Sequence, residues 1–144
     1  MRIPEEYIQN IAERLHLYKE LDEIETEEKL IQFAEQLKDR FGPVPQQVFV
    51  LMDTIRLRWQ AKKLGFEKIL LKNRTLKAYF ISNQKSAYFQ SPLFSSILKF
   101  VQLHPRACKM KEDKGKLSLT LVNIGNVKEA IRLFDRMMEN EPVS

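Results

Sequence analysis

The sequence lacks the features that mark exported and membrane-inserted proteins. Its one cysteine, Cys108, has no partner for an internal disulfide, so we expect the chain in a reducing compartment, the cytoplasm. The longest apolar run, residues 48–52, is far shorter than the roughly 20 residues of a transmembrane helix. The first residues have neither the apolar stretch nor the cleavage site of a signal peptide. We therefore expect no contact with a membrane.

The sequence is also poor in the residues from which active sites are built. It has four glycines, none close to another, and it has no phosphate-binding loop, nucleophile elbow or paired metal-binding histidine motif. We expect His16 at the surface, His104 at a helix end and Cys108 in the core. These residues make too small a set of ligands for a metal site. We therefore expect no catalysis, no metal and no cofactor in this chain.

What the sequence does have is a strongly uneven distribution of charge. Residues 1–53 carry 6 basic and 12 acidic side chains, a net charge of −6, whereas residues 54–144 carry 18 and 7, a net charge of +11. No acidic residue occurs between Glu67 and Glu112. This asymmetry is compatible with an acidic partner for one half, with attraction between the halves, or with solubility alone.

Apolar residues spaced three and four apart predict three helices in the first part of the chain. The first is expected over residues 7–24. The second is capped by Thr26 and ends at Gly42, and the third covers residues 45–64 and is closed by Gly65. The expected buried stripes are Ile8, Ile11, Leu15, Tyr18 and Leu21, then Leu30, Phe33, Leu37 and Phe41, then Val48, Leu51, Met52, Ile55 and Trp59.

From Phe66 the pattern changes to two hairpins, each followed by a helix. Alternation places Leu117, Leu119 and Leu121 on one side of a strand and Lys116, Ser118 and Thr120 on the other. The expected strands are 66–72, 75–81, 107–111 and 116–122; the expected helices are 92–103 and, capped by Asn126, about 127–140, with Val127, Ala130, Ile131, Phe134 and Met138 inward.

The predicted fold class is α+β, with three N-terminal helices followed by two ββα units that share a small antiparallel sheet. We expect one domain over residues 1–144, with a helical part in residues 1–65 and a ββαββα part in residues 66–144. Residues 82–90 form the only expected loop that is long enough to be mobile.

The end of the second helix is a first candidate for binding. Gln36, Asp39 and Arg40 can project outward there while Leu37 and Phe41 are buried. An Asp–Arg couple can exchange ion pairs with a charged partner, and the guanidinium fork gives that pairing a direction. The alternative is that Arg40 complements the helix dipole and Asp39 is only solvated. Physical reasoning alone favours this alternative, because an exposed ion pair contributes under about 1 kcal/mol.

A basic stretch followed by the acid-free region 68–111 is a second candidate, for nucleic acid. Its lysines could neutralise phosphates, and its aromatic residues Tyr79, Tyr88 and Phe89 could stack on bases. However, the lysines alternate with core residues, as a solvated sheet face requires, and no recognised nucleic-acid motif is present. Direct nucleic-acid binding is therefore the alternative hypothesis. The helical residues of this candidate surface are Arg56, Arg58, Lys62 and Lys63.

Four stretches of the sequence, within residues 3–66, resemble the C-terminal domain of bacterial transcription-repair coupling factors (Mfd). They are Ile3-Pro4-Glu5-Glu6-Tyr7-Ile8, Arg14-Leu15-x-x-Tyr18-Lys19, Asp39-Arg40-Phe41-Gly42-Pro43-Val44-Pro45, and Ile55-Arg56-Leu57-Arg58 through Lys63-Leu64-Gly65.

The resemblance implies that the chain is a terminal part of a large protein. The helicase-like motor of that protein, which uses ATP, displaces stalled RNA polymerase from damaged DNA and helps to recruit UvrA. None of the motor motifs occurs here.

The resemblance further implies a regulatory role. In this family the C-terminal domain packs on an N-terminal module that resembles UvrB and masks the surface to which UvrA would bind. The matching positions are Asp39 and Arg40, with Gln36 one turn earlier. The family often has an acidic residue near Gln36, so this chain departs from the family pattern there. The resemblance thus favours an interdomain surface at this helix end over simple solvation.

Overall fold

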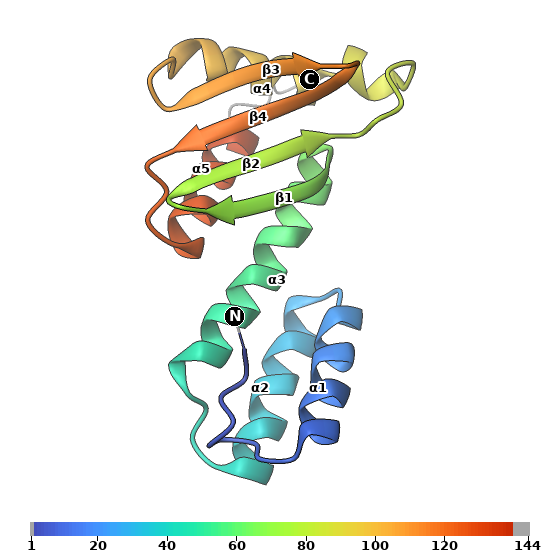
Figure 1. The fold of residues 1–144 in the computed structure, drawn as a ribbon. Coiled ribbons are helices and arrows are strands. Elements are labelled where there is room, and N and C mark those ends of the chain that lie inside the picture. The colour runs from blue at the N-terminus through green and yellow to red at the C-terminus, as the bar shows by residue number, and fades with distance from the viewer. Residues whose placement is uncertain (1, 140–144) are drawn as a thin grey trace. The chain divides into compact units, whose positions relative to one another are not determined.

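The structure is a computed structural model, and it describes residues 2–139. Within these residues the chain forms five α-helices, one 3-10 helix and four strands, and three of the helices precede the strands, as predicted for an α+β fold. The chain divides into two compact units, residues 1–56 (the N-terminal unit) and residues 57–144 (the C-terminal unit) (Figure 1). None of the helices in the described part is long and apolar enough to cross a membrane.

The N-terminal unit consists of α1 (Ile11–Glu23), α2 (Glu27–Phe41) and the first turns of α3 (Gln46–Leu64). As predicted, α2 is capped by Thr26, whose side chain accepts a hydrogen bond from the backbone N–H of Lys29 at 3.2 Å. The apolar side chains buried in this unit include Ile3, Ile8, Leu17, Leu21, Ile24, Leu30, Phe33, Leu37, Val48, Met52 and Ile55.

The start of α1 differs from the prediction of a helix from residue 7. The helix begins at Ile11, because the side chain of Asn10 accepts a hydrogen bond from the N–H of Glu13 at 3.0 Å and so caps it. The preceding residues form a turn in which the N–H groups of Tyr7 and Ile8 donate to the carbonyl of Pro4.

The buried stripe predicted for the first helix is wrong in part. Ile11 and Leu15 are 65% and 63% exposed, whereas Leu17 and Leu21 are buried. This segment contains two series of apolar residues at helical spacing. Ile8 precedes the exposed residues Ile11 and Leu15 in one series, and the buried residues Leu17 and Leu21 form the other. Ile8 is itself buried, but from the turn before the helix, where the helical period does not set its direction.

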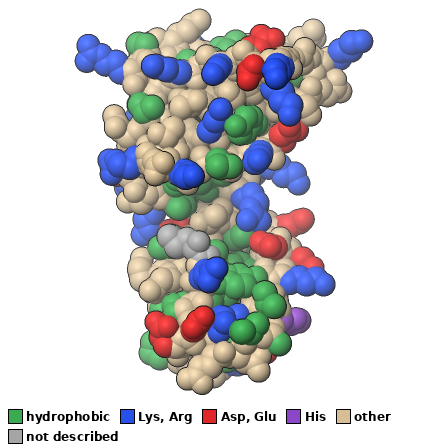
Figure 2. All heavy atoms as spheres, viewed as in Figure 1, with side chains coloured by type: hydrophobic (Ala, Val, Ile, Leu, Met, Phe, Trp, Pro, Cys, Tyr) green, Lys and Arg blue, Asp and Glu red, His purple; other side chains and the backbone are tan. Residues whose placement is uncertain are grey.

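The C-terminal unit is built on one antiparallel sheet with strand order β1-β2-β4-β3. Its strands are β1 (Phe66–Lys72), β2 (Thr75–Phe80), β3 (Cys108–Asp113) and β4 (Lys116–Val122), and its helices are α4 (Pro92–Leu103) and α5 (Val127–Glu139). Both helices lie behind the sheet in Figure 1 and cover one of its faces. The open face is turned to the viewer in Figure 2, and lysine and arginine side chains (blue) are spread over it.

Turn chemistry fixes the hairpins of this sheet. Asn73 and Arg74 both have positive φ angles, 53° and 59°, and Lys114 and Gly115 have 51° and 79°. Two successive residues with positive φ give the type I′ turn, whose twist matches that of the flanking strands. The register that follows pairs Lys72 with Thr75 across β1 and β2, and Asp113 with Lys116 across β3 and β4.

Two details of this unit differ from the prediction. The strand expected over residues 107–111 runs from Cys108 to Asp113. Ser118 lies on the opposite side of β4 from the leucines, as predicted, and it is buried there because its small side chain lies between its cross-strand neighbours Tyr79 and Lys111. Met137 of α5 is fully buried, whereas Met138 is partly buried; the predicted helix end at Asn140 lies outside the described residues.

The segment predicted as a mobile loop, residues 82–90, contains the 3-10 helix η1 (Ala87–Gln90). Tyr88 and Phe89 of η1 pack against the core, where their rings contact Phe94 with centroids 5.5 Å and 5.1 Å apart. These two aromatic residues therefore stabilise the C-terminal unit and do not form an open surface for stacking on bases.

Along the chain, the boundary between the two compact units lies within α3, after residue 56, and not at residue 65 where the sequence pattern changes. Leu57, Ala61 and Leu64 of α3 belong to the core that the sheet, α4 and α5 form. The last turns of this helix are thus part of the C-terminal unit, although periodicity assigns them to the helical half of the chain.

Candidate functional site

Gln36, Asp39 and Arg40 lie on the exposed side of the last turns of α2. Leu30, Phe33 and Leu37 form the buried stripe of this helix, and Gln36, Asp39 and Arg40 lie off that stripe. All three candidate side chains are exposed, as the sequence predicted. Residues three and four apart are neighbours on a helix surface, which places Asp39 and Arg40 one turn from Gln36 on a common polar surface.

The end of α2 is fixed by backbone and side-chain contacts. Gly42 has a φ of 90°, and its N–H donates to the carbonyl of Lys38 at 3.0 Å. The hydroxyl of Tyr7 contacts the carbonyl oxygens of Gly42 at 2.8 Å and of Leu37 at 3.2 Å. Partial burial raises the pKa of Tyr7, so this hydroxyl keeps its proton and acts as the donor.

Arg40 is held in place from two sides. Its guanidinium forms an ion pair with Glu13 of α1, and it lies over the ring of Phe41 at 4.7 Å from the centroid. Its side chain nevertheless stays 55% exposed. Arg40 is thus an ordered cation that still faces solvent, and it remains in the last turn of α2, where a positive charge also complements the helix dipole.

Asp39 and Gln36 are less constrained. Among the residues that the structure describes, Asp39 makes no hydrogen bond or ion pair. Gln36 lines a shallow hollow of about 290 Å³ together with Phe33 of α2 and Ile24. The helix end thus presents a carboxylate, an amide and an oriented guanidinium to whatever lies beside it.

Sequence reasoning missed Tyr7 and Glu13, the two residues that order this helix end. Both lie far from Arg40 in the sequence, so no local pattern connects them with it. Tyr7 does occur in the first of the four stretches that carried the family resemblance. That stretch is also tied to the second one, since Arg14 donates to the carbonyl of Ile8 at 2.6 Å and the hydroxyl of Tyr18 accepts from the N–H of Ile3.

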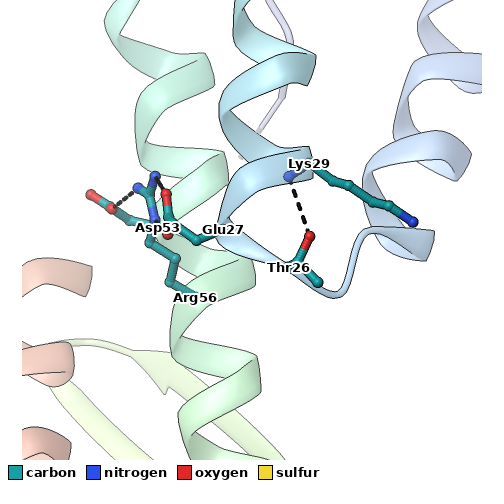
Figure 3. A network of polar contacts seen from close by, with 5 residues as sticks. All are labelled: Thr26, Glu27, Lys29, Asp53 and Arg56. Atoms are coloured by element: carbon teal, nitrogen blue, oxygen red, sulfur yellow. Dashed lines mark hydrogen bonds and ion pairs between the residues drawn. The ribbon is translucent and has the colours of Figure 1, made fainter.

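Arg56, the first residue of the alternative basic surface, has a structural role. Its guanidinium donates to both carboxylate oxygens of Glu27 at 2.7 Å and to Asp53 at 2.8 Å (Figure 3). These bonds raise the pKa of Arg56 and lower that of Glu27. Arg56 thus ties the start of α2 to α3 within the N-terminal unit. Arg58, Lys62 and Lys63 are exposed on the part of α3 that belongs to the C-terminal unit.

The residues considered for catalysis and metal binding lie apart. No group of three or more His, Cys, Asp or Glu side chains converges within residues 2–139 in a way that could hold a metal ion. Cys108 is buried in the core, as predicted, and burial raises the pKa of its thiol to about 11. His104 ends α4 and packs on Phe100 with ring centroids 4.3 Å apart, while His16 is exposed, also as predicted.

A family model described as TRCF domain matches residues 1–91, well over half of the chain. The chain belongs to the TRCF domain family. The match extends past residue 66, where the resemblance read from the sequence ended, and includes β1, β2 and η1. It thus contains the whole α2 end with Gln36, Asp39 and Arg40.

The relatives of this TRCF domain are much longer proteins. It is 30% identical over 103 residues to the transcription-repair-coupling factor of Borreliella burgdorferi, a match over 72% of this chain and 9% of that protein. It is 27% identical over 140 residues to the factor of Staphylococcus haemolyticus, a match over 94% of this chain and 12% of that protein. With the factor of Escherichia coli K12 it shares 39% identity over 67 residues, 46% of this chain and 6% of that one.

The fold of this TRCF domain is also found in a solved structure. The crystal structure of the C-terminal domain of a transcription-repair coupling factor matches it with a TM-score of 0.69 at 16% sequence identity. The match covers 97% of this chain and 88% of that chain. The combination of three helices and a four-stranded sheet is thus a known architecture.

Proposed function

We propose that this chain is a non-catalytic regulatory domain of a transcription-repair coupling factor. It packs on the UvrB-like N-terminal module of the same protein and masks the surface that UvrA would bind. Engagement with RNA polymerase and DNA by the ATP-driven motor of that protein releases the mask during transcription-coupled repair. The family membership and the small share of the relatives' length that the chain spans support a role within a larger protein.

One observation carries the masking role. The exposed row of Gln36, Asp39 and Arg40 stands on a helix end that Tyr7 and Glu13 hold in one conformation. The oriented guanidinium of Arg40 can bind an anionic group with little loss of side-chain entropy, and the carboxylate of Asp39, which has no partner among the described residues, can bind a cation beside it. Such a polar contact can open in water without exposing a large apolar surface, as a reversible mask must.

The mechanism is a shift between a closed and an open population. A closed state that is favoured by about 2.7 kcal/mol leaves roughly 1% of the molecules open, and this lowers the apparent affinity for UvrA about 100-fold. A ligand that binds the open state better than the closed one reverses the balance. A contact made of a few ion pairs and hydrogen bonds is of the right strength, because each contributes about 1 kcal/mol.

The test is the double substitution Asp39→Ala with Arg40→Ala in the full-length factor. We expect its affinity for UvrA, measured by calorimetric titration, to rise roughly 20-fold, because the loss of two polar contacts weakens the closed state by about 2 kcal/mol. The matched control is Lys19→Ala with Glu28→Ala, which removes one base and one acid from exposed positions away from the last turns of α2. This control should leave the affinity unchanged.

Binding in trans completes the test. The 144-residue chain should bind the isolated UvrB-like module, and the Asp39→Ala/Arg40→Ala variant should bind it more weakly. A double variant that binds both UvrA and the module as the unchanged protein does would remove this helix end from the mechanism.

A further inference from the structure

The open face of the sheet in the C-terminal unit carries a regular array of lysines. The strand register aligns Lys68, Tyr79 and Lys111 in one row across the sheet, with Ser118 between the last two. The next row contains Lys77 and Lys109. Because side chains alternate along a strand, the lysines that share this face are Lys68, Lys72, Lys77, Lys109, Lys111 and Lys116.

Acidic side chains are few beside these lysines, and Asp113 is the cross-strand neighbour of Lys116. Within residues 2–139, none of the six forms an ion pair. On the strands, Asp113 at the end of β3 is the acidic residue that shares the open face, and Glu67 lies at the irregularity of β1. The face is therefore a strongly positive surface that attracts an anionic partner.

An aromatic ring lies in the middle of this positive surface. Tyr79 of β2 has the ammonium groups of Lys77 and Lys68 at 5.2 Å and 6.0 Å from its ring centroid. Beside it is a hollow of about 260 Å³, which Tyr79, Leu117 and Lys116 line. Glu67 also borders this hollow, and its carboxylate accepts from the N–H and hydroxyl of Ser82 at 3.3 Å.

We propose that this open sheet face binds single-stranded nucleic acid, with phosphates on the lysine rows and a base on Tyr79. A flat sheet with a central aromatic ring presents a stacking surface to an unpaired base, which a duplex does not expose. An acidic protein surface would be met better by arginine forks, whereas every cation on the strands of this face is a lysine, which binds phosphate as a point charge.

This inference is independent of the proposed masking role. The lysine rows and Tyr79 belong to the C-terminal unit, whereas Gln36, Asp39 and Arg40 belong to the N-terminal unit. It keeps part of the surface predicted from the sequence, the acid-free region 68–111 with Tyr79, but not Arg56, which is engaged with Glu27 and Asp53.

The experiment measures fluorescence anisotropy of a labelled oligothymidylate of about 15 nucleotides with the 144-residue chain. If about three phosphates are neutralised, affinity should fall roughly 20-fold between about 50 mM and about 200 mM salt. An oligouridylate of the same length distinguishes DNA from RNA as the preferred strand. A duplex of the same length should bind more weakly than either strand, and polyglutamate should not displace the oligothymidylate.

Two sets of variants test the lysines and the ring separately. Lys77→Gln with Lys109→Gln should weaken binding about tenfold or more and reduce its salt dependence. The matched control is Lys99→Gln with Lys128→Gln, which removes the same charge from α4 and α5 on the covered side and should change the affinity little. Tyr79→Leu should weaken binding about fivefold or more, whereas Tyr79→Phe keeps the stacking ring and should bind normally.

Several results would overturn the proposal. These are failure of both single strands to bind at low salt, equal or tighter binding of the duplex, and displacement by polyglutamate at matched charge. An equal loss of affinity in the two double-lysine variants would also overturn it, because it would show that total charge and not this face determines binding. Circular dichroism of each variant establishes that the sheet is intact.

Discussion

At the scale of single residues, the candidate surface depends on side chains that do not belong to it. Tyr7 satisfies carbonyl groups at the end of α2, and Glu13 holds the guanidinium of Arg40. The last carbonyl groups of a helix have no partners within the helix, so a donor from elsewhere in the chain is needed to order them. Removal of that donor should weaken both the helix end and the surface that it presents.

We therefore expect Tyr7→Phe to destabilise the N-terminal unit by about 1 kcal/mol, because the substitution removes a hydrogen bond to Gly42 and keeps the ring that packs on Phe41. Urea unfolding followed by circular dichroism measures this change. Tyr79→Phe is the control, since the Tyr79 hydroxyl makes no hydrogen bond with a described residue and its loss should cost little. Equal midpoints for Tyr7→Phe and the unchanged chain would show that water replaces this donor.

At the scale of elements, two glycines end helices in the same way but in different surroundings. Gly42 after α2 and Gly65 after α3 have φ angles of 90° and 96°, a backbone conformation that strains other residues. A side chain at Gly42 would meet open space. At Gly65 it would overlap the ring of Tyr88, whose hydroxyl donates to the carbonyl of Leu64 at 2.5 Å.

The two substitutions to alanine should therefore differ in cost. Gly42→Ala should destabilise the chain by about 1 kcal/mol, which is the backbone strain alone. Gly65→Ala should cost about 3 kcal/mol or more, because η1 must also move away from α3. Thermal unfolding of the two variants under one set of conditions measures the difference. If both variants lost the same stability, the close approach of Tyr88 to Gly65 would make no contribution to the free energy of unfolding.

The same scale shows what the sequence could reveal about the fold. α2 was predictable because its signals agree: the cap Thr26, the stripe of Leu30, Phe33 and Leu37, and the stop at Gly42. α1 was predicted less well, because its two apolar series are both helical in period and only tertiary packing decides which one is buried. Ile11 and Leu15 belong to the series that stays exposed.

The candidate site was predictable to a similar extent. The exposure of Gln36, Asp39 and Arg40 followed from the period of α2, since they lie off its buried stripe. The ion pair of Arg40 with Glu13 joins residues that are distant in the sequence, and such contacts depend on how two helices pack. For the lysines of the open sheet face, the sequence showed only that they alternate with apolar residues along each strand. Their alignment in rows across the sheet depends on how the strands pair.

At the scale of the whole molecule, the boundary between the two compact units lies at a different residue from the change in the hydrophobic pattern. The hydrophobic period changes from helical to alternating at Phe66, so the sequence predicted the division after residue 65. The core of the C-terminal unit includes Leu57 and Leu64, which lie before that point. A secondary-structure element ends where its hydrogen bonds end, whereas a compact unit ends where its buried contacts end, and in α3 these are different residues.

We therefore expect a fragment of residues 57–144 to fold and a fragment of residues 66–144 to be unstable. The shorter fragment loses the buried side chains of Leu57, Ala61 and Leu64, a loss of roughly 4 kcal/mol or more, and this is a large part of the stability of a small domain. It also loses Gly65, whose carbonyl accepts from the N–H of Ile81 at 3.0 Å. Circular dichroism and urea unfolding of the two fragments measure the difference.

A third fragment separates the loss of packing from the loss of length. Residues 57–144 with Leu57→Ala and Leu64→Ala keep the last turns of α3 but remove its two largest contributions to the core, so this fragment should unfold at much lower urea than the unsubstituted one. Stable folding of residues 66–144 would place the boundary where the sequence pattern changes. The end of α3 would then be an attachment to the C-terminal unit and not a part of its core.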